Sequence, residues 1–352
     1  MTPTPDLSRP GFLTIAERGI GDGLTLLPSL RALHTAHPEL RIELITPGLL
    51  SLADNLRDEV TVLDHRPLEE LGEEGRLAWL RTRNVGWVWN TEAGGPWAAA
   101  LRRSDQPTWV TTRSQRHWGS RNVLQVRFAQ LREWFPGLPA PGEVFLPLTP
   151  EQEAARQAFR AGFPTDSLLV ALQPGAGDPR RIWPEDKFRA LACALLERPH
   201  VTVIFFLSES ESRFGVPGYL PAHSNLLRVS ARLEDVVPKL AACDLCIGND
   251  SGFYHLAFAL GLRVVGIHRS LRGAQRWAYR SPRSRVVINW MPRQLDRDWA
   301  RWVSVPRVLR AARKLAPGLR STTRSEPSPT ASPGTPTGTN SPHPSTTYTR
   351  VF

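Results

Sequence analysis

The sequence predicts an α/β fold with two doubly wound, mainly parallel sheets, one in each half of the chain. Short apolar runs alternate with helix-length segments, which is the pattern of a sheet built from βαβ units. The pattern stops in a stretch with five prolines between Pro136 and Pro150 and then starts again. Each half is long enough to bury its own core. We therefore expect an N-terminal domain over residues 1–145 and a C-terminal domain over residues 146–316.

The first half opens with the apolar strand FLTIA, a glycine-rich turn and an amphipathic helix. Leu26, Leu30 and Leu33 fall at helical spacing in this helix, and His37-Pro38 closes it. The runs RIELITPG, VTVLDH and NVGWVWNTE follow as a second, third and fourth strand, separated by helix-length segments. These four strands make up the sheet expected in the first domain.

The second half repeats this alternation. The run VTVIFFLSE is so apolar that we expect it to be buried on both faces of the sheet. Other strands are expected at SLLVALQ, LCIGN and RVVGIHRS, with helices over 151–163, 184–198, 233–243 and 253–261. A further helical region covers residues 295–315. Residues 317–352 are rich in Ser, Thr and Pro, and we expect them to form a disordered tail because they offer little apolar surface to bury.

Composition limits the classes of partner. The formal charge of +11 fits an anionic acceptor or a phospholipid surface. Basic residues are spread along the chain and no nucleic-acid motif accompanies them, so nucleic acid is not an expected partner. No apolar run approaches the ~18 residues of a membrane span, and the N-terminus lacks a secretory pattern. We expect a cytoplasmic protein with peripheral contact to the inner face of the plasma membrane.

The three cysteines give no disulfide framework. The short spacing of Cys243 and Cys246 would suit half of a metal site, but no second Cys or His pair has matching spacing. The two residues also lie in an apolar segment, where cysteine acts as a small hydrophobic residue. The sequence therefore predicts no metal cofactor.

Polar groups gather in three glycine-rich turns that follow expected strands. The first turn, from Gly19 to Gly23, contains Asp22 where a helix begins. Asp22 could be an N-cap and nothing more, or it could act as a general base toward an acceptor hydroxyl. The turn lacks the third glycine of the dinucleotide-binding fingerprint.

The second turn contains Gly175, Ala176 and Gly177, with Arg180 and Arg181 shortly after them. Backbone N–H groups of such a turn, with the following helix, form a site for phosphate, and an arginine adds a bidentate contact. The alternative is an ordinary loop with surface arginines.

The third turn contains Asp250, Ser251, Gly252 and His255. Capping of the next helix would account for Asp250 and Ser251. It would leave the glycine and the histidine without an explanation.

Taken together, these turns resemble glycosyltransferase family 9, which contains the bacterial heptosyltransferases. The resemblance lies in G-D near the N-terminus, then P-G-x-x-x-x-x-x-x-W-P, then D-S-G-x-x-H followed by LAFALGLRVVGI, and covers roughly residues 11–316. It implies the GT-B architecture, in which two Rossmann-like domains face a cleft. It also implies inverting, metal-independent transfer from a nucleotide-diphosphate sugar, such as ADP-heptose, to an envelope glycolipid or glycan.

The resemblance also implies roles for single residues. Asp22 would be the catalytic base, and Arg181 would stabilise the leaving diphosphate where the family usually has lysine. The residues implied in donor binding are Gly175, Ala176, Gly177, Glu211, Asp250, Ser251, Gly252 and His255. Ala176 and Gly177 replace hydroxyl residues that are common in the family, and Arg269-Ser270 replaces a usual G-P pair. The donor sugar therefore stays open.

Two other functions fit the same architecture. One is a nucleotide-sugar epimerase, which also needs acid and base groups at the sugar. The other is a non-catalytic protein that binds a nucleotide sugar or acts as a scaffold in envelope synthesis. The presence of Asp22 favours an enzyme, whereas Arg181 and Ala176 leave the non-catalytic alternative open.

Overall fold

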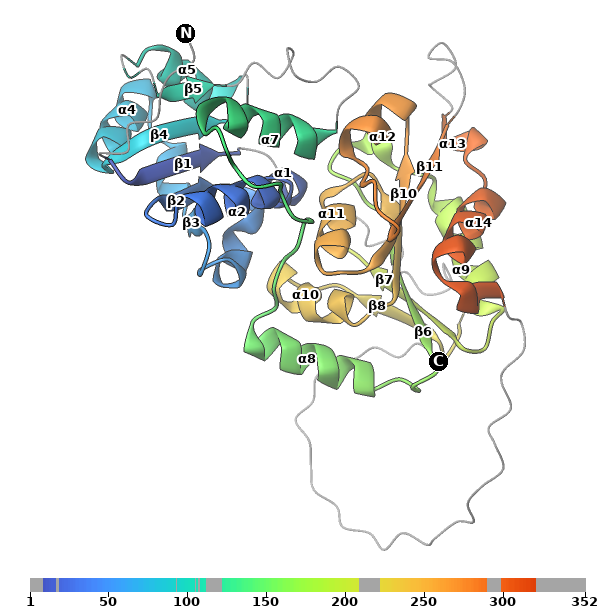
Figure 1. Cartoon of the computed structure of the whole chain (residues 1–352). Coiled ribbons are helices and arrows are strands. Elements are labelled where there is room, and N and C mark those ends of the chain that lie inside the picture. Colours follow the sequence, from blue (N-terminus) through green and yellow to red (C-terminus); the bar gives the residue numbers. More distant parts are fainter. Residues whose placement is uncertain are drawn as a thin grey trace, which may run out of the picture.

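A computed structural model describes residues 9–16, 19–92, 94–104, 106, 108–111, 122–208, 222–289 and 299–320. The described chain forms two α/β halves that lie side by side (Figure 1), each built on a parallel sheet. This confirms the predicted fold class. Among the described residues, no helix is both long and apolar enough to cross a membrane.

The first sheet has five strands in the order β3-β2-β1-β4-β5. The strands are β1 (Gly11–Ile15), β2 (Arg41–Ile45), β3 (Thr61–Leu63), β4 (Val85–Asn90) and β5 (Trp109–Thr111). Its helices are α1 (Ile20–Leu24), α2 (Leu27–Ala36), η1 (Pro47–Asn55), α3 (Arg66–Glu69), α4 (Glu73–Thr82), α5 (Gly95–Arg102) and α7 (Val123–Trp134). Neighbouring residues of β1 point to opposite faces of the sheet, since Phe12 and Leu13 belong to different hydrophobic clusters. Helices therefore cover both faces.

The second sheet has six strands in the order β11-β10-β9-β6-β7-β8. The strands are β6 (Leu168–Gln173), β7 (Val201–Phe206), β8 (Leu226–Val229), β9 (Leu245–Asn249), β10 (Arg263–His268) and β11 (Ser284–Ile288). Its helices are α8 (Pro150–Ala161), η2 (Pro179–Arg181), α9 (Glu185–Leu196), α10 (Leu233–Ala241), α11 (Gly252–Ala259), α12 (Leu271–Trp277), α13 (Trp299–Trp302), α14 (Val305–Leu315) and η5 (Pro317–Arg320). All of β7 is buried, as its apolar sequence predicts.

The strand order fixes where loops from different parts of the chain meet. In each sheet the order reverses next to the first strand, between β1 and β4 and between β6 and β9. Ligands of doubly wound sheets bind at such switch points, beyond the carboxyl ends of the strands. The three predicted turns follow β1, β6 and β9, so all of them lie at switch-point strands.

Some expectations are corrected in detail. The helix expected after the first turn is two helices, α1 and α2, and the short strands β5, β8 and β11 were not predicted. The tail was expected to begin at residue 317, but Pro317–Arg320 form a short helix in which Leu319 is only 1% exposed. Arg198 Nε donates to the Leu319 carbonyl at 2.9 Å, which ties this segment to the second domain. Residues 321–352 lie outside the described residues.

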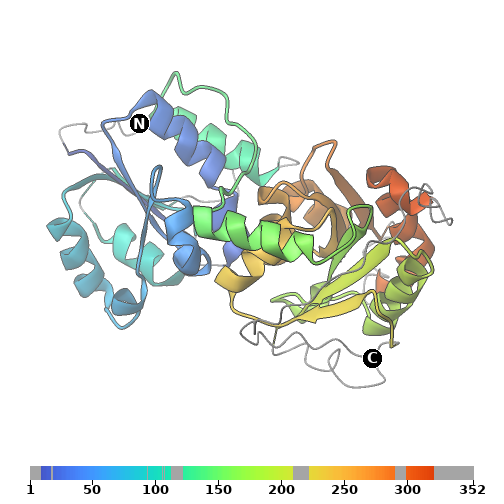
Figure 2. The same ribbon diagram turned by 90° about the horizontal axis from the view of Figure 1, so that it is seen from below.

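The two halves lie side by side in both views (Figure 1 and Figure 2), and they meet where α1 packs against α11. The helices approach closely because both carry glycine at the contact. A Cβ on Gly21 would stand 2.5 Å from His255 Cδ2, and a Cβ on Gly252 would stand 3.3 Å from Ile20 Cβ. One hydrophobic cluster includes buried residues of both halves, so the core continues across the contact.

We expect Gly21→Ala to destabilise the protein by about 1–3 kcal/mol, the usual cost of overpacking. The His255 ring is buried and held by a hydrogen bond, so it cannot move aside easily. Gly19→Ala is the matched control, because a Cβ there has no atom within 4 Å. Urea unfolding of both variants measures the difference, and equal stabilities would contradict the close contact.

Candidate active site

A buried asparagine joins the second and third predicted turns. Asn249 ends β9 and has no exposed surface. Its Nδ2 donates to the carbonyls of Pro174 at 2.6 Å and Gly175 at 3.3 Å, and its Oδ1 accepts from the Trp183 N–H at 3.0 Å. One side chain thus satisfies three backbone groups and fixes the loop after β6 against the end of β9.

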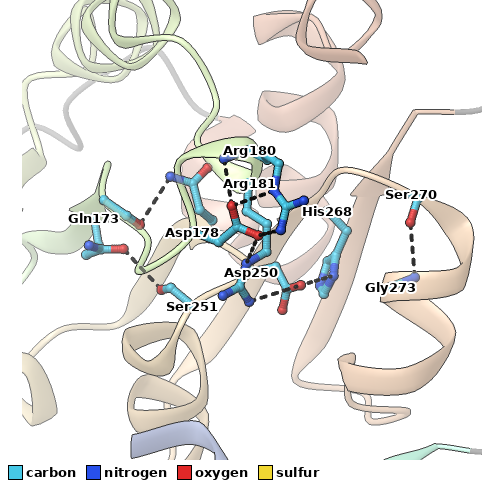
Figure 3. Close-up of polar contacts among 11 residues, drawn as sticks. Gln173, Asp178, Arg180, Arg181, Asp250, Ser251, His268, Ser270 and Gly273 are labelled. Atoms are coloured by element: carbon cyan, nitrogen blue, oxygen red, sulfur yellow. Dashed lines mark hydrogen bonds and ion pairs between the residues drawn. The ribbon is translucent and has the colours of Figure 1, made fainter. Parts of the chain in front are cut away.

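Asp250 follows Asn249, and its carboxylate lies between the side chains of Arg181 and His268 (Figure 3). Its Oδ2 is 3.7 Å from Arg181 Nη1 and 3.6 Å from His268 Nδ1. Burial raises the pKa of Asp250, but its interactions with His268, and the weaker attraction of His255 and Arg181, outweigh burial and bring the pKa below its ordinary value. Asp250 is therefore ionised near pH 7, with the Arg181 guanidinium as a nearby counter-charge.

Arg181 is positioned by acids on two sides. Its Nε lies 4.0 Å from Asp178 Oδ2, which also holds Arg180 through a 2.9 Å bond to Nη2. The side chain of Arg181 is 39% exposed, and no described residue accepts a hydrogen bond from its Nε. The Arg181 side chain is thus partly exposed beside Asp250, while Arg180 is bound to Asp178.

His268 is a site residue that the sequence analysis missed. It ends β10 with no exposed surface, and among the described residues neither ring nitrogen has a hydrogen-bond partner. Its ring packs edge-on against Tyr254 at a centroid distance of 5.7 Å. The sequence gives no signal for this residue, because its position beside Asp250 depends on the pairing of β10 with β9.

Ser251 and Gly252 occupy the start of α11. Ser251 is at the N-cap position, but its hydroxyl makes no capping bond and instead donates to Gln173 Oε1 at 3.2 Å. The capping explanation is therefore wrong for this side chain. Gly252 provides the space in which α1 approaches.

His255 lies at the contact between the domains. Its Nδ1 bonds the hydroxyl of Tyr279 at 2.8 Å, and the residue is 4% exposed. Burial lowers the pKa of His255 to about 4, against the attraction of Asp250. The ring is therefore neutral near pH 7, and it packs on Gly21 of α1.

Asp22 lies in the first turn of α1 and is not its N-cap, which is Gly19. The capping explanation is therefore wrong here too. Asp22 Oδ1 accepts a 3.3 Å bond from Arg127 Nη2, and Arg127 Nη1 donates to the Asp22 carbonyl at 2.6 Å and to the Thr25 hydroxyl. Arg127 is a buried residue of α7; burial lowers its pKa, while Asp22 and Glu92 act in the opposite direction.

The remaining predicted residues are placed as follows. Gly175 is buried, Ala176 is half-buried and Gly177 is exposed, so the turn after β6 opens to solvent along its length. Glu211 lies outside the described residues. Asn249, His268 and Arg127 are the residues that sequence reasoning did not assign to the site.

Two adjoining Rossmann-like domains, with glycine-containing turns after β1 and β6 and carboxylates from both domains near their contact, have the arrangement of the GT-B class. Residues 103–297, more than half of the chain, match the family described as glycosyltransferase family 9 (heptosyltransferase). The chain belongs to this family, and the protein is a glycosyltransferase. The match includes the turns at Gly175 and Asp250 and begins after Asp22.

Solved structures with the same fold extend the similarity to the first domain. A family 9 glycosyltransferase from Veillonella parvula is 17% identical, covering 91% of this chain and 100% of its own, with a TM-score of 0.73. The ADP-heptose LPS heptosyltransferase II of E. coli is 17% identical, with coverage of 88% and 98% and a TM-score of 0.65. E. coli heptosyltransferase WaaC, solved with ADP, is 14% identical, with coverage of 87% and 100% and a TM-score of 0.61. No curated protein matches the sequence.

The neutral state of His255 predicts a pH-dependent stability. Above pH 6.5 the ring is neutral in the folded and unfolded chain. As the pH falls from 6.5 toward 4, the unfolded chain takes up a proton that the folded chain excludes, so stability is lost in this window. We expect a loss of about 2 kcal/mol at pH 5, at ~1.36 kcal/mol per pKa unit.

Urea unfolding at pH 7 and pH 5 measures this loss. His255→Asn is the control, because its side chain keeps a group near the Nδ1 position but does not titrate. The variant should lose less stability than the wild type between the two pH values. Equal losses in the variant and the wild type would mean that folding does not lower the pKa of His255.

Proposed function

We propose that the protein is an inverting, metal-independent glycosyltransferase that moves heptose or a related sugar from an ADP-linked donor to a cell-envelope glycolipid or glycan. The observation that carries the proposal is that each domain places a carboxylate on or next to a helix of the domain contact. Asp22 lies on α1 of the first domain, and Asp250 lies two residues before α11 of the second, the helix that packs against α1. E. coli WaaC, which has the same fold, was solved with ADP and with a fluorinated ADP-heptose.

In this proposal the second domain holds the donor. The turn at Gly175 and the start of α11 offer backbone groups to the diphosphate, as glycine-rich turns do in other nucleotide-binding folds. Arg181 adds the positive charge that stabilises the diphosphate as the glycosidic bond breaks. The partial exposure of its side chain supports this role, because it leaves the cation accessible to a ligand. Asp250 and Asp178 hold the guanidinium in place.

Asp22 would take the proton from the acceptor hydroxyl while that oxygen attacks the anomeric carbon from the face opposite the leaving group. Attack from that face inverts the configuration. Arg127 holds the Asp22 carboxylate through one oxygen, Oδ1. A cytoplasmic protein acting at the inner face of the membrane would meet both an ADP-linked donor and a lipid-linked acceptor.

A binding screen tests the donor. The full chain is titrated with ADP, UDP and their sugar conjugates in the presence of EDTA, and nucleotide-diphosphate release is then measured with candidate acceptors. We expect ADP-linked sugars to bind with the chelator present. Binding that appears only on addition of a divalent cation would contradict the metal-independent mechanism.

Asp22→Asn should lower turnover by roughly 10²–10⁴-fold, the contribution of general-base catalysis. The amide can still accept the bond from Arg127, so the melting temperature should change little. Asp166→Asn is the control: this exposed carboxylate precedes β6, at the opposite end of the second sheet, and turnover should not change. A folded Asp22→Asn variant with full turnover would exclude Asp22 as the base.

Arg181→Ala should weaken donor binding and lower kcat together, because the charge on the diphosphate grows in the transition state. Arg180→Ala is the neighbouring control; Arg180 is 76% exposed and bound to Asp178, so its loss should have a much smaller effect. Arg181→Lys restores the usual family residue. Retained activity means that the two cations are equivalent here, and a loss means that the planar guanidinium is needed for this donor. An active Arg181→Ala variant with unchanged donor affinity would contradict the role.

A further inference from the structure

All of the net positive charge of the chain comes from one part of the sequence. Residues 251–325 contain 16 arginine or lysine residues and two aspartates, a net charge of +14, which exceeds the +11 of the whole chain. Between Asp250 and Asp296 there is no acidic residue. Basic residues occur along the whole chain, but acidic residues balance them only outside this part. Basic residues are thus spread along the chain as expected, but the net charge is concentrated in residues 251–325.

The fold gathers this charge on one surface. A pocket of about 460 Å³ lies between α12, the edge strand β11 and α14, which are neighbours at one side of the second domain (Figure 1). Five basic side chains line it: Arg280, Arg285, Arg307, Arg310 and Lys314. We call the surface formed by α12, β11, α13 and α14 the basic face.

These five cations have no acidic partner among the described residues. Arg285 Nη1 donates to the Ser284 carbonyl at 2.7 Å, and Arg307 Nη2 donates to the Ile288 carbonyl at 2.9 Å. In the first domain, by contrast, Arg103 is paired with two glutamates. Cations kept close together without counter-charges repel one another, and an external anion would relieve this repulsion.

Large apolar side chains lie exposed among the cations. Leu271 of α12 is 48% exposed, Val286 of β11 37% and Trp302 of α13 49%. They are three of the four large hydrophobic residues that are exposed within the described chain. Arg307 links α13 to the pocket, since its Nη1 donates to the Trp302 carbonyl at 2.7 Å.

We propose that the basic face docks on an anionic phospholipid bilayer. Arginine and lysine side chains would contact lipid phosphates, while the leucine, valine and tryptophan side chains enter the headgroup region. A nucleic-acid surface would explain the cations but not the exposed aliphatic residues. Charge and apolar exposure together therefore favour a membrane.

The basic face adjoins the candidate active site. Its helix α12 is capped by Ser270, whose hydroxyl accepts from the Gly273 N–H at 3.2 Å. A Cβ on Gly273 would lie 4.0 Å from Asp250 Oδ2, so the first turn of α12 borders the site (Figure 3). A bilayer on this face would bring a lipid-linked acceptor close to the donor. The purpose of docking rests on the proposed function, but docking itself can be measured without donor or acceptor.

Vesicle flotation with the full chain tests the proposal. We expect binding to vesicles of phosphatidylcholine with 30% phosphatidylglycerol, no binding to pure phosphatidylcholine, and weaker binding as salt rises. The triple variant Arg280→Gln, Arg310→Gln and Lys314→Gln should bind about a hundredfold more weakly, from roughly fivefold for each cation removed near an anionic surface. A control variant with Arg57→Gln, Arg81→Gln and Arg132→Gln loses the same charge from the first domain and should bind within about twofold of wild type.

A second variant tests the apolar contribution. Leu271→Ser with Val286→Ser keeps every cation but should lower vesicle binding at a salt concentration where charge is screened. Equal binding of the basic-face and control variants would overturn the proposal, as would equal binding to neutral vesicles. A duplex oligonucleotide that binds more tightly than the anionic vesicles would assign the face to a nucleic acid instead. Melting temperature and ADP affinity confirm that each variant is folded; if the triple variant is not, Arg310→Gln alone should show the fivefold loss.

Discussion

The candidate site depends on the close approach of α1 to α11. Glycine lies on both sides of this contact, at Gly21 and Gly252, and each lacks the side chain that would separate the helices. On its other side α1 meets η1, where Gly23 leaves room for Leu49. The short helix α1 therefore packs between α11 and η1, with its backbone close to both. The glycines of the first turn act here in helix packing, which is a different use from the binding of phosphate.

A buried arginine supports the same arrangement. Burying a guanidinium is costly unless its donors are satisfied, and Arg127 meets this need by bonding the Asp22 carboxylate, the Asp22 carbonyl and Thr25. Asn122, which caps the same helix α7, donates to the Ala278 carbonyl at 2.8 Å beyond the end of α12. Helix α7 of the first domain therefore contacts Asp22 of the candidate site through Arg127. Through its N-cap Asn122 it also contacts the end of α12, which forms part of the basic face. Catalytic geometry and the proposed membrane contact are linked through one element.

The sequence allowed the two sheets and the three turns to be predicted because both depend on local patterns. Apolar runs marked the buried strands, and polar residues after them marked the carboxyl ends. Strands β5, β8 and β11 were missed because they have three to five residues and are only partly buried. Arg127 was missed because its partners lie more than 100 residues away, so only the folded chain reveals why a charged residue is buried in α7. His268 and Asn249 were missed because their places depend on the sheet: His268 lies beside Asp250 through the pairing of β10 with β9, and Asn249 bonds the loop after β6.

The contacts of the two carboxylates support a division of roles between them. Asp250 has a side chain 9% exposed and lies within 4 Å of both Arg181 and His268. Taking up a proton there would leave the Arg181 guanidinium without this counter-charge, so Asp250 is suited to hold the guanidinium in place. The Asp22 side chain is 17% exposed and is held by one long bond through Oδ1. An acceptor hydroxyl that approached Oδ2 could transfer its proton without breaking that bond. The base of the reaction is therefore better sought on α1 than in the more deeply buried motif of the second domain.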